Sequence, residues 1–243
     1  YLGRVLLDQQ LYARAFQELD PSRGQWPPDA AFLIQAATGY IALGRQENAR
    51  KALDDLAPLA LNDAQSLHAA LLLLAVHEND RAIDLFRKLS KRQPAVQTPW
   101  IQFDLALAYL FVGRYEEAAA QANSFLEKSP AAGSDTAEAA SAWSLIGIAY
   151  AHLGQGDRAV RAFRQAAVLD PAQEEHWLNL TRELMELQNY SDAISAVREA
   201  LTAIPKSYAL HLRLGAANLS AGRYAEAESA FRDLVAAGDP LPT

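Results

Sequence analysis

Residues 143–171 read WSLIGIAYAHLGQGDRAVRAFRQAAVLDP. Gly154 lies near the middle of this stretch and Pro171 lies at its end. Glycine ends the first helix, because glycine adopts the left-handed conformation of a helix C-cap without a steric penalty. Proline stops the second helix, since it has no N–H to donate and its ring clashes with the preceding turn. The stretch therefore predicts a hairpin of two helices.

Residue size follows a pattern within this hairpin. Small residues such as Gly147 and Ala159 let two helices approach closely, and large residues such as Tyr150 and Phe163 fill the space around that contact. A single hairpin cannot bury both of its faces. Stacking of successive hairpins along the chain is then needed to complete the core.

The same pattern recurs along the whole chain of 243 residues. Equivalent alanines follow one another at intervals of 34, 33, 36, 41, 34 and 34 residues: Ala15, Ala49, Ala82, Ala118, Ala159, Ala193 and Ala227. The two longer intervals predict inserted loops before Pro99 and around residues 131–137. We therefore expect a single solenoid domain over residues 1–243, with approximate repeats 1–29, 30–62, 63–98, 99–139, 140–173, 174–207 and 208–243.

The repeat resembles the tetratricopeptide repeat. The resemblance rests in the stretch quoted above on Trp143, Ile146, Gly147, Tyr150, Leu153, Gly154, Ala159, Phe163, Ala166 and Pro171. The next two repeats match at Trp177, Leu180, Tyr190, Ala193, Ala200, Pro205, Leu214, Gly215, Gly222, Tyr224, Ala227 and Phe231. The resemblance implies an all-α fold, a right-handed α-solenoid superhelix of stacked helix-turn-helix hairpins.

Some positions depart from the family pattern. Leu61 replaces the proline that ends a repeat, and His77 replaces the turn glycine, so we expect looser turns there. The first repeat begins within its first helix. Trp143 and Trp177 fall in the packing column and are predicted to belong to the core.

Composition and charge exclude several classes of protein. The formal net charge of −7 repels phosphate backbones, so nucleic-acid partners are not expected. The longest apolar run, residues 69–76, is too short to span a membrane, so membrane insertion is not expected. With no cysteine, the composition fits a cytoplasmic or a periplasmic or secreted location. The chain opens at Tyr1, so we expect an upstream segment to have been removed.

The sequence offers no catalytic motif. The histidines show no i, i+4 pair and no metal-ligand spacing, and there is no phosphate-binding loop after a strand and no nucleophile elbow. We expect a non-enzyme with no cofactor, metal or catalytic residue.

In the family that the chain resembles, the first helix of each hairpin lines the concave surface, where peptides or helices of partners bind. Removing the packed columns leaves a candidate groove of apolar residues in the middle and polar residues toward the C-terminus: Leu67, His68, Leu71, Trp100, Phe103, Asp104, Leu107, Phe111, Ile148, Asn179, Arg182 and Arg213. The alternative is that Trp100, Phe103 and Phe111 pack against neighbouring helices.

These features predict a non-catalytic scaffold that binds a protein or peptide partner in the groove. One alternative is a structural spacer or self-assembly module that forms a homo-oligomer through its C-terminal end. There the last repeat places Ala216, Leu219, Ala221 and Leu234 where a following helix would cover them. Another alternative is the recognition arm of a larger enzyme.

Overall fold

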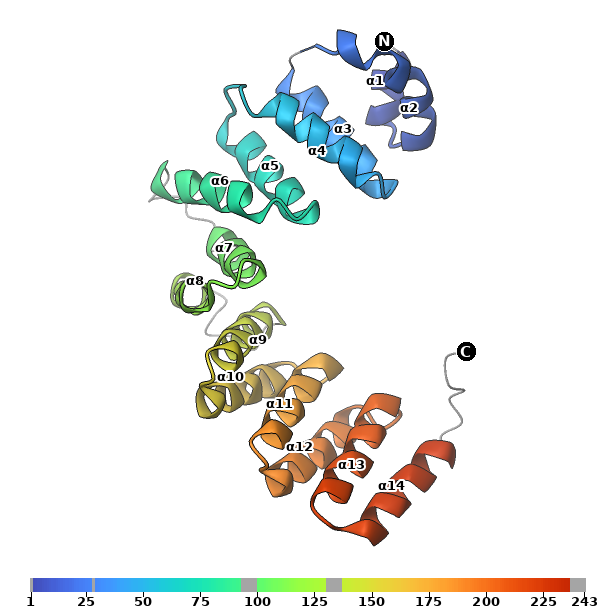
Figure 1. Ribbon diagram of the computed structural model, residues 1–243, viewed down its shortest axis with the longest axis vertical. Coiled ribbons are helices and arrows are strands. Elements are labelled where there is room, and N and C mark those ends of the chain that lie inside the picture. The colour runs from blue at the N-terminus through green and yellow to red at the C-terminus, as the bar shows by residue number, and fades with distance from the viewer. Residues whose placement is uncertain (1, 28, 93–99, 130–136, 237–243) are drawn as a thin grey trace. The chain divides into compact units, whose positions relative to one another are not determined.

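A computed structural model describes residues 2–27, 29–92, 100–129 and 137–236 (Figure 1). These residues form fourteen α-helices and one short 3₁₀ helix, and no β-strand occurs among them. The all-α prediction is confirmed. The two predicted insertions fall on residues 93–99 and 130–136, so they lie outside the described residues, apart from Ala137, which begins a helix.

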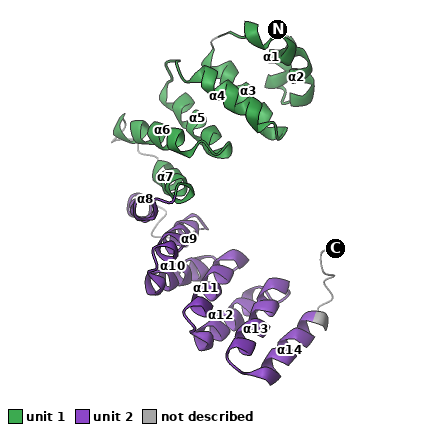
Figure 2. Cartoon of the chain, in the orientation of Figure 1, with its two compact units in different colours: residues 1–112 green, residues 113–243 purple. Residues whose placement is uncertain are grey.

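The chain divides into two compact units, residues 1–112 and 113–243 (Figure 2). The first unit contains α1 (Leu2–Asp8), α2 (Tyr12–Leu19), the 3₁₀ helix η1 (Asp20–Gln25), α3 (Ala30–Ala42), α4 (Gln46–Leu56), α5 (Asp63–Ala75), α6 (Asn79–Arg92) and α7 (Trp100–Phe111). Helix α1 pairs with α2, α3 with α4 and α5 with α6, and α7 packs on α6. The first helices of successive hairpins also touch, α1 against α3 and α3 against α5.

The second unit repeats this arrangement. It contains α8 (Tyr115–Lys128), α9 (Ala137–His152), α10 (Gly156–Leu169), α11 (Glu174–Glu186), α12 (Tyr190–Ala203), α13 (Tyr208–Ser220) and α14 (Tyr224–Ala236). Helix α8 packs on α9, and the hairpins α9–α10, α11–α12 and α13–α14 follow. Stacked helical hairpins are thus confirmed within each unit, whereas a single domain over the whole chain stays a prediction.

The core of both units is built on the repeat. All seven of the equivalent alanines are at most 3% exposed: Ala15, Ala49, Ala82, Ala118, Ala159, Ala193 and Ala227. An alanine side chain at a helix crossing lets the neighbouring backbone come close, and the larger side chains around it then exclude water. The column that revealed the repeat is therefore buried in every repeat.

The turns inside the hairpins are alike whether or not they hold glycine. Gly44 has φ of 69° and His77 has φ of 63°, so both adopt the left-handed conformation. The N–H of His77 donates to the carbonyl of Leu74 at 3.0 Å, and that of Gly44 donates to Ile41 at 2.9 Å. The expectation of a looser turn at His77 is wrong. Its backbone keeps the turn and accepts the strain that a side chain brings to a positive φ.

The other departure, Leu61, lies in the connection between α4 and α5. There Asn62 caps α5, since its side chain accepts from the N–H of Gln65 while the Gln65 side chain accepts from the N–H of Asn62. This capping box begins α5 without help from a proline.

Candidate functional site

The first unit places an apolar set of candidate residues on α5 and α7. Leu71 is 41% exposed on α5, and Trp100 and Phe111 are 47% and 56% exposed on α7. Leu67 is half-buried and His68 is exposed. The exposure of Trp100 and Phe111 argues against the alternative that both are core residues, because a packed aromatic ring is almost fully covered.

Phe103 and Leu107 are half-buried on the same helix. The rings of Trp100 and Phe103 meet edge to face with 5.8 Å between their centroids. Relative to the repeat alanines, Phe103 and Leu107 occupy the positions that Leu67 and Leu71 hold in the preceding repeat. The two helices therefore present equivalent positions, and each presents leucine or phenylalanine there.

Asp104 is the exception in this apolar set. Its side chain is half-buried and makes no hydrogen bond or ion pair with any residue that the structure describes. Burial raises the pKa of the Asp104 carboxyl from 3.8 to about 6. The ionised carboxylate is partly desolvated and has no compensating cation among the described residues, which makes it a ready acceptor for a cationic group.

Asp104→Asn is expected to stabilise the protein at pH 7.5 and to have no effect near pH 3.5. The pKa of Asp104 is higher in the folded chain than in the unfolded chain, so stability falls as pH rises from about 4 to about 6. Asparagine resembles the protonated form at every pH and removes this loss. Urea denaturation of both proteins at several pH values measures the difference. A gain that persists unchanged at pH 3.5 would contradict the assignment to Asp104 ionisation.

The second unit places the remaining candidates, one apolar and three polar, on three helices. Ile148 is half-buried on α9 and Arg213 is half-buried on α13. On α11, Asn179 is 7% exposed and its side-chain oxygen accepts from the Arg182 guanidinium at 2.9 Å. Helix α11 contacts both α9 and α13, so these residues belong to three adjacent helices. Asn179 is already engaged, and the accessible cations of the set are Arg182 and Arg213.

A buried pair at this place was not predicted from the sequence. Ser144 Oγ on α9 and His176 Nδ1 on α11 share a hydrogen bond of 2.8 Å, and the two residues are 8% and 6% exposed. Burial lowers the pKa of His176 against the opposing effect of Asp170 and Glu175. A serine nucleophile needs access to substrate and a third group that orients the histidine. The pair is instead buried, and its hydrogen bond joins α9 to α11.

The two tryptophans that were predicted to belong to the core differ in burial. Trp177 is 2% exposed and its Nε1 donates to the carbonyl of Pro171 at 3.0 Å, as expected for a core residue. Trp143 is half-buried and borders a cavity of about 400 Å³ together with Arg158 and Arg161. Trp177 is therefore a core residue, as expected, whereas Trp143 is only partly covered by its neighbours.

The described residues contain no group of three or more His, Asp or Glu side chains arranged to hold a metal ion. None of their helices combines the length and the apolar character that crossing a membrane requires.

Known proteins are similar to this chain in family and in fold. The family profile described as tetratricopeptide repeat matches residues 103–174 and 178–242, more than half of the chain. No curated protein sequence matches this chain.

Three solved structures show the fold. The C-terminal part of a repeat protein of this type from Cytophaga hutchinsonii has a TM-score of 0.68 at 14% identity, over 97% of this chain and 93% of that one. A tetratricopeptide repeat protein from Parabacteroides merdae has a TM-score of 0.63 at 16% identity, over 98% and 91%. YrrB, described as having an unusual peptide-binding site, has a TM-score of 0.55 at 16% identity, over 77% and 91%.

Proposed function

Because the chain belongs to the tetratricopeptide repeat family, we propose that it is a non-catalytic scaffold that binds a segment of a protein partner. The observation that carries the proposal is the face of α7, where Trp100 and Phe111 are exposed and Asp104 pairs with no cation that the structure describes. Exposed aromatic residues that surround a polar group are the usual anatomy of a binding hot spot.

The chemistry of this face indicates the partner. Apolar side chains of the partner cover Phe111 and its neighbours, and a lysine or arginine pairs with Asp104. Such a pairing is favourable because the cost of burying the Asp104 carboxylate is already present in the free protein. The peptide-binding site named for YrrB, which shares the fold, supports binding of a peptide rather than of a small molecule.

Selection from a random peptide library displayed on phage tests the proposal. We expect enriched peptides to carry two or more apolar residues next to a lysine or arginine. Phe111→Glu and Leu71→Glu are expected to weaken these peptides about tenfold or more, because each places a charge on an exposed apolar contact. Fluorescence anisotropy of the labelled peptides measures the affinities. Phe111 and Leu71 suit this purpose because they are exposed, so that the substitutions leave the core intact.

The matched control is Val168→Glu on α10. Val168 is 58% exposed, about as much as Phe111 at 56%, but it lies on the second helix of its hairpin. Its substitution is expected to leave peptide affinity unchanged. Equal weakening by Val168→Glu, or enrichment of peptides that bind all three variants alike, would contradict the proposed face.

Self-association is a second candidate function. Leu212 and Leu219 on α13 and Tyr224 on α14 are 45%, 52% and 71% exposed, which favours apolar contact through these last helices. Of the residues expected to be uncovered, Leu219 is exposed, whereas Leu234 is only 8% exposed. Light scattering across a concentration series separates this function from peptide binding, since only self-association raises the mean mass.

A further inference from the structure

The hairpin α5–α6 borders a cavity, and the size of the residues at two positions of the repeat explains it. The position sixteen residues before the repeat alanine holds a larger residue in the other repeats: Leu33, Gln102, Trp143, Trp177 and His211. In α5 the same position holds Ser66. Three residues later Ala69 stands where the second unit has Ile146 and Leu180. Two large side chains that fill the space between stacked hairpins are thus replaced by two small ones.

The space that larger side chains would fill at these two positions is a cavity in the structure. A cavity of about 420 Å³ lies over Ser66, Ala69 and Leu73 of α5, between α4 and α6. Its remaining walls are mostly leucine, with Leu53 and Leu56 from α4 and Leu85 and Leu89 from α6. This volume is within the range of pockets that hold small ligands, and the walls are apolar as such pockets usually are.

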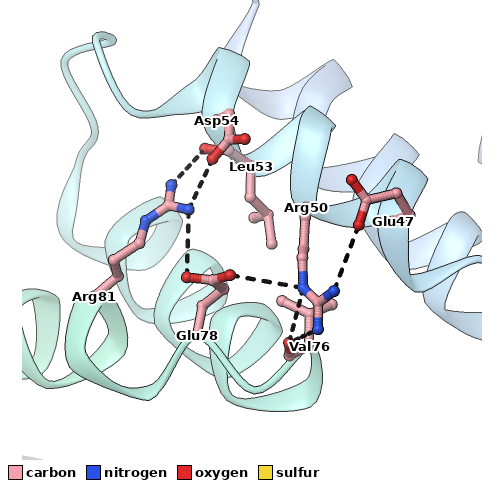
Figure 3. A network of polar contacts seen from close by, with 7 residues as sticks. All are labelled: Glu47, Arg50, Leu53, Asp54, Val76, Glu78 and Arg81. Carbon is pink, nitrogen blue, oxygen red and sulfur yellow. Dashed lines mark hydrogen bonds and ion pairs between the residues drawn. The ribbon is translucent and has the colours of Figure 1, made fainter.

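Polar contacts join the helices that wall the cavity (Figure 3). Arg50 on α4 donates to the carbonyl of Val76 at the end of α5, at 2.9 Å from Nη2 and 3.2 Å from Nε. Arg81 on α6 pairs with Asp54 on α4 at 2.8 Å and donates to the carbonyl of Leu53 at 3.3 Å. Helix α4 is therefore tied to both ends of the α5–α6 turn, although it packs on α5 less closely than α12 packs on α13.

The border of the cavity is mostly cationic. Arg81, Lys88 and Arg92 line it, and Asp84 is the single carboxylate. Arg81 is neutralised by Asp54, and Arg92 lies 3.9 Å from Asp63. Lys88 is exposed and forms no ion pair with the described residues. A leucine-walled cavity whose border is mostly cationic, with a lysine that no described residue pairs, favours an apolar ligand with one negative group.

We propose that this cavity is a binding site for an amphipathic carboxylate, with its aliphatic chain over Ser66 and Ala69 and its carboxylate at Lys88. The site is separate from the peptide-binding face proposed above, which comprises the exposed sides of α5 and α7. Ser66, Ala69 and Leu73 share one side of α5, and at 100° per residue Leu67 and Leu71 lie on another. The two sites can therefore be tested independently.

Titration with sodium decanoate tests the proposal. We expect one molecule to bind with a dissociation constant on the order of 0.1 mM, measured by calorimetry, as befits a ligand of this size. Leucine methyl signals in NMR spectra locate it: those of Leu73 and Leu85 shift most, and those of Leu67 and Leu71 stay in place. The neutral analogue decanol binds several-fold more weakly, because it lacks the charge that Lys88 attracts.

Variants separate a ligand site from a simple packing defect. Ser66→Leu fills the cavity with the residue that Leu33 provides in the second repeat, and it is expected to weaken decanoate at least about tenfold while raising the melting temperature. Ala75→Leu, an exposed change on the same helix, is the control. Lys88→Gln weakens decanoate about threefold, and Lys91→Gln, an equal change of charge outside the cavity, leaves it unchanged.

The outcomes that overturn the proposal are distinct. Absence of decanoate binding to the unaltered chain overturns it, as does undiminished binding to folded Ser66→Leu. If Ser66→Leu does not fold, as judged by circular dichroism, Ala69→Ile and the methyl shifts of the unaltered chain decide between the same outcomes. Methyl shifts confined to Leu67 and Leu71 also overturn the proposal, since they place the ligand on the peptide-binding face.

Discussion

Gly147→Ala is expected to lower the free energy of unfolding of the second unit by about 2 kcal/mol. A Cβ atom at Gly147 would lie 2.5 Å from ring atoms of Phe163 and 2.9 Å from its Cγ. Phe163 is fully buried, so its ring has no free space into which to move. Overpacking of this kind costs about 1–3 kcal/mol, and the better helix propensity of alanine returns up to about 1 kcal/mol.

Urea denaturation followed by tryptophan fluorescence measures this loss, because Trp143 and Trp177 report on the second unit. Gly24→Ala is the control, since a Cβ there meets no atom within 4 Å. The control is expected to show no loss of stability. An unchanged midpoint for Gly147→Ala would contradict the prediction and would mean that the Phe163 ring has room to move.

The repeat made much of the fold predictable from the sequence. The alanine equivalent to Ala159 is buried in all seven repeats. The same packing requirement therefore recurs seven times in the sequence, and the repeat stays recognisable where a single position departs from it. The turn at His77 shows the limit of this reasoning. Its residue type predicts a different turn, but the N–H groups of His77 and Glu78 donate to the carbonyls of Leu74 and Leu73 and keep the left-handed geometry.

The candidate site was predictable only in part. Helical spacing placed Phe111 and Leu71 on exposed positions, because the packed columns could be subtracted. The hydrogen bond between Ser144 and His176 joins residues 32 positions apart, and the sequence holds no signal for that pairing. The cavity over Ser66 did have a signal, namely a serine in a column that holds larger residues in the other repeats, two of them tryptophan.

The same column yields the largest expected effect on stability. Trp177→Ala is expected to lower the free energy of unfolding by about 4 kcal/mol, because removal of a large buried aromatic side chain leaves a cavity. Trp177 is 2% exposed, and it belongs to a buried cluster with Phe163 and Leu180. The hydrogen bond from its Nε1 to Pro171, which links α11 to the end of the preceding hairpin, is lost as well. Urea denaturation followed by circular dichroism measures the change.

Two further substitutions separate the contributions to this loss. Trp177→Phe keeps most of the apolar volume but removes the Nε1–H donor, so a loss of about 1–2 kcal/mol is expected. Trp143→Ala occupies the equivalent position in the preceding repeat, where the side chain is only half-buried. Its loss should be about half that of Trp177→Ala, since less apolar surface leaves the core. Equal losses at Trp143 and Trp177 would mean that burial does not set the contribution of this column. The cavity over Ser66 would then not follow from the size of the residue at that position.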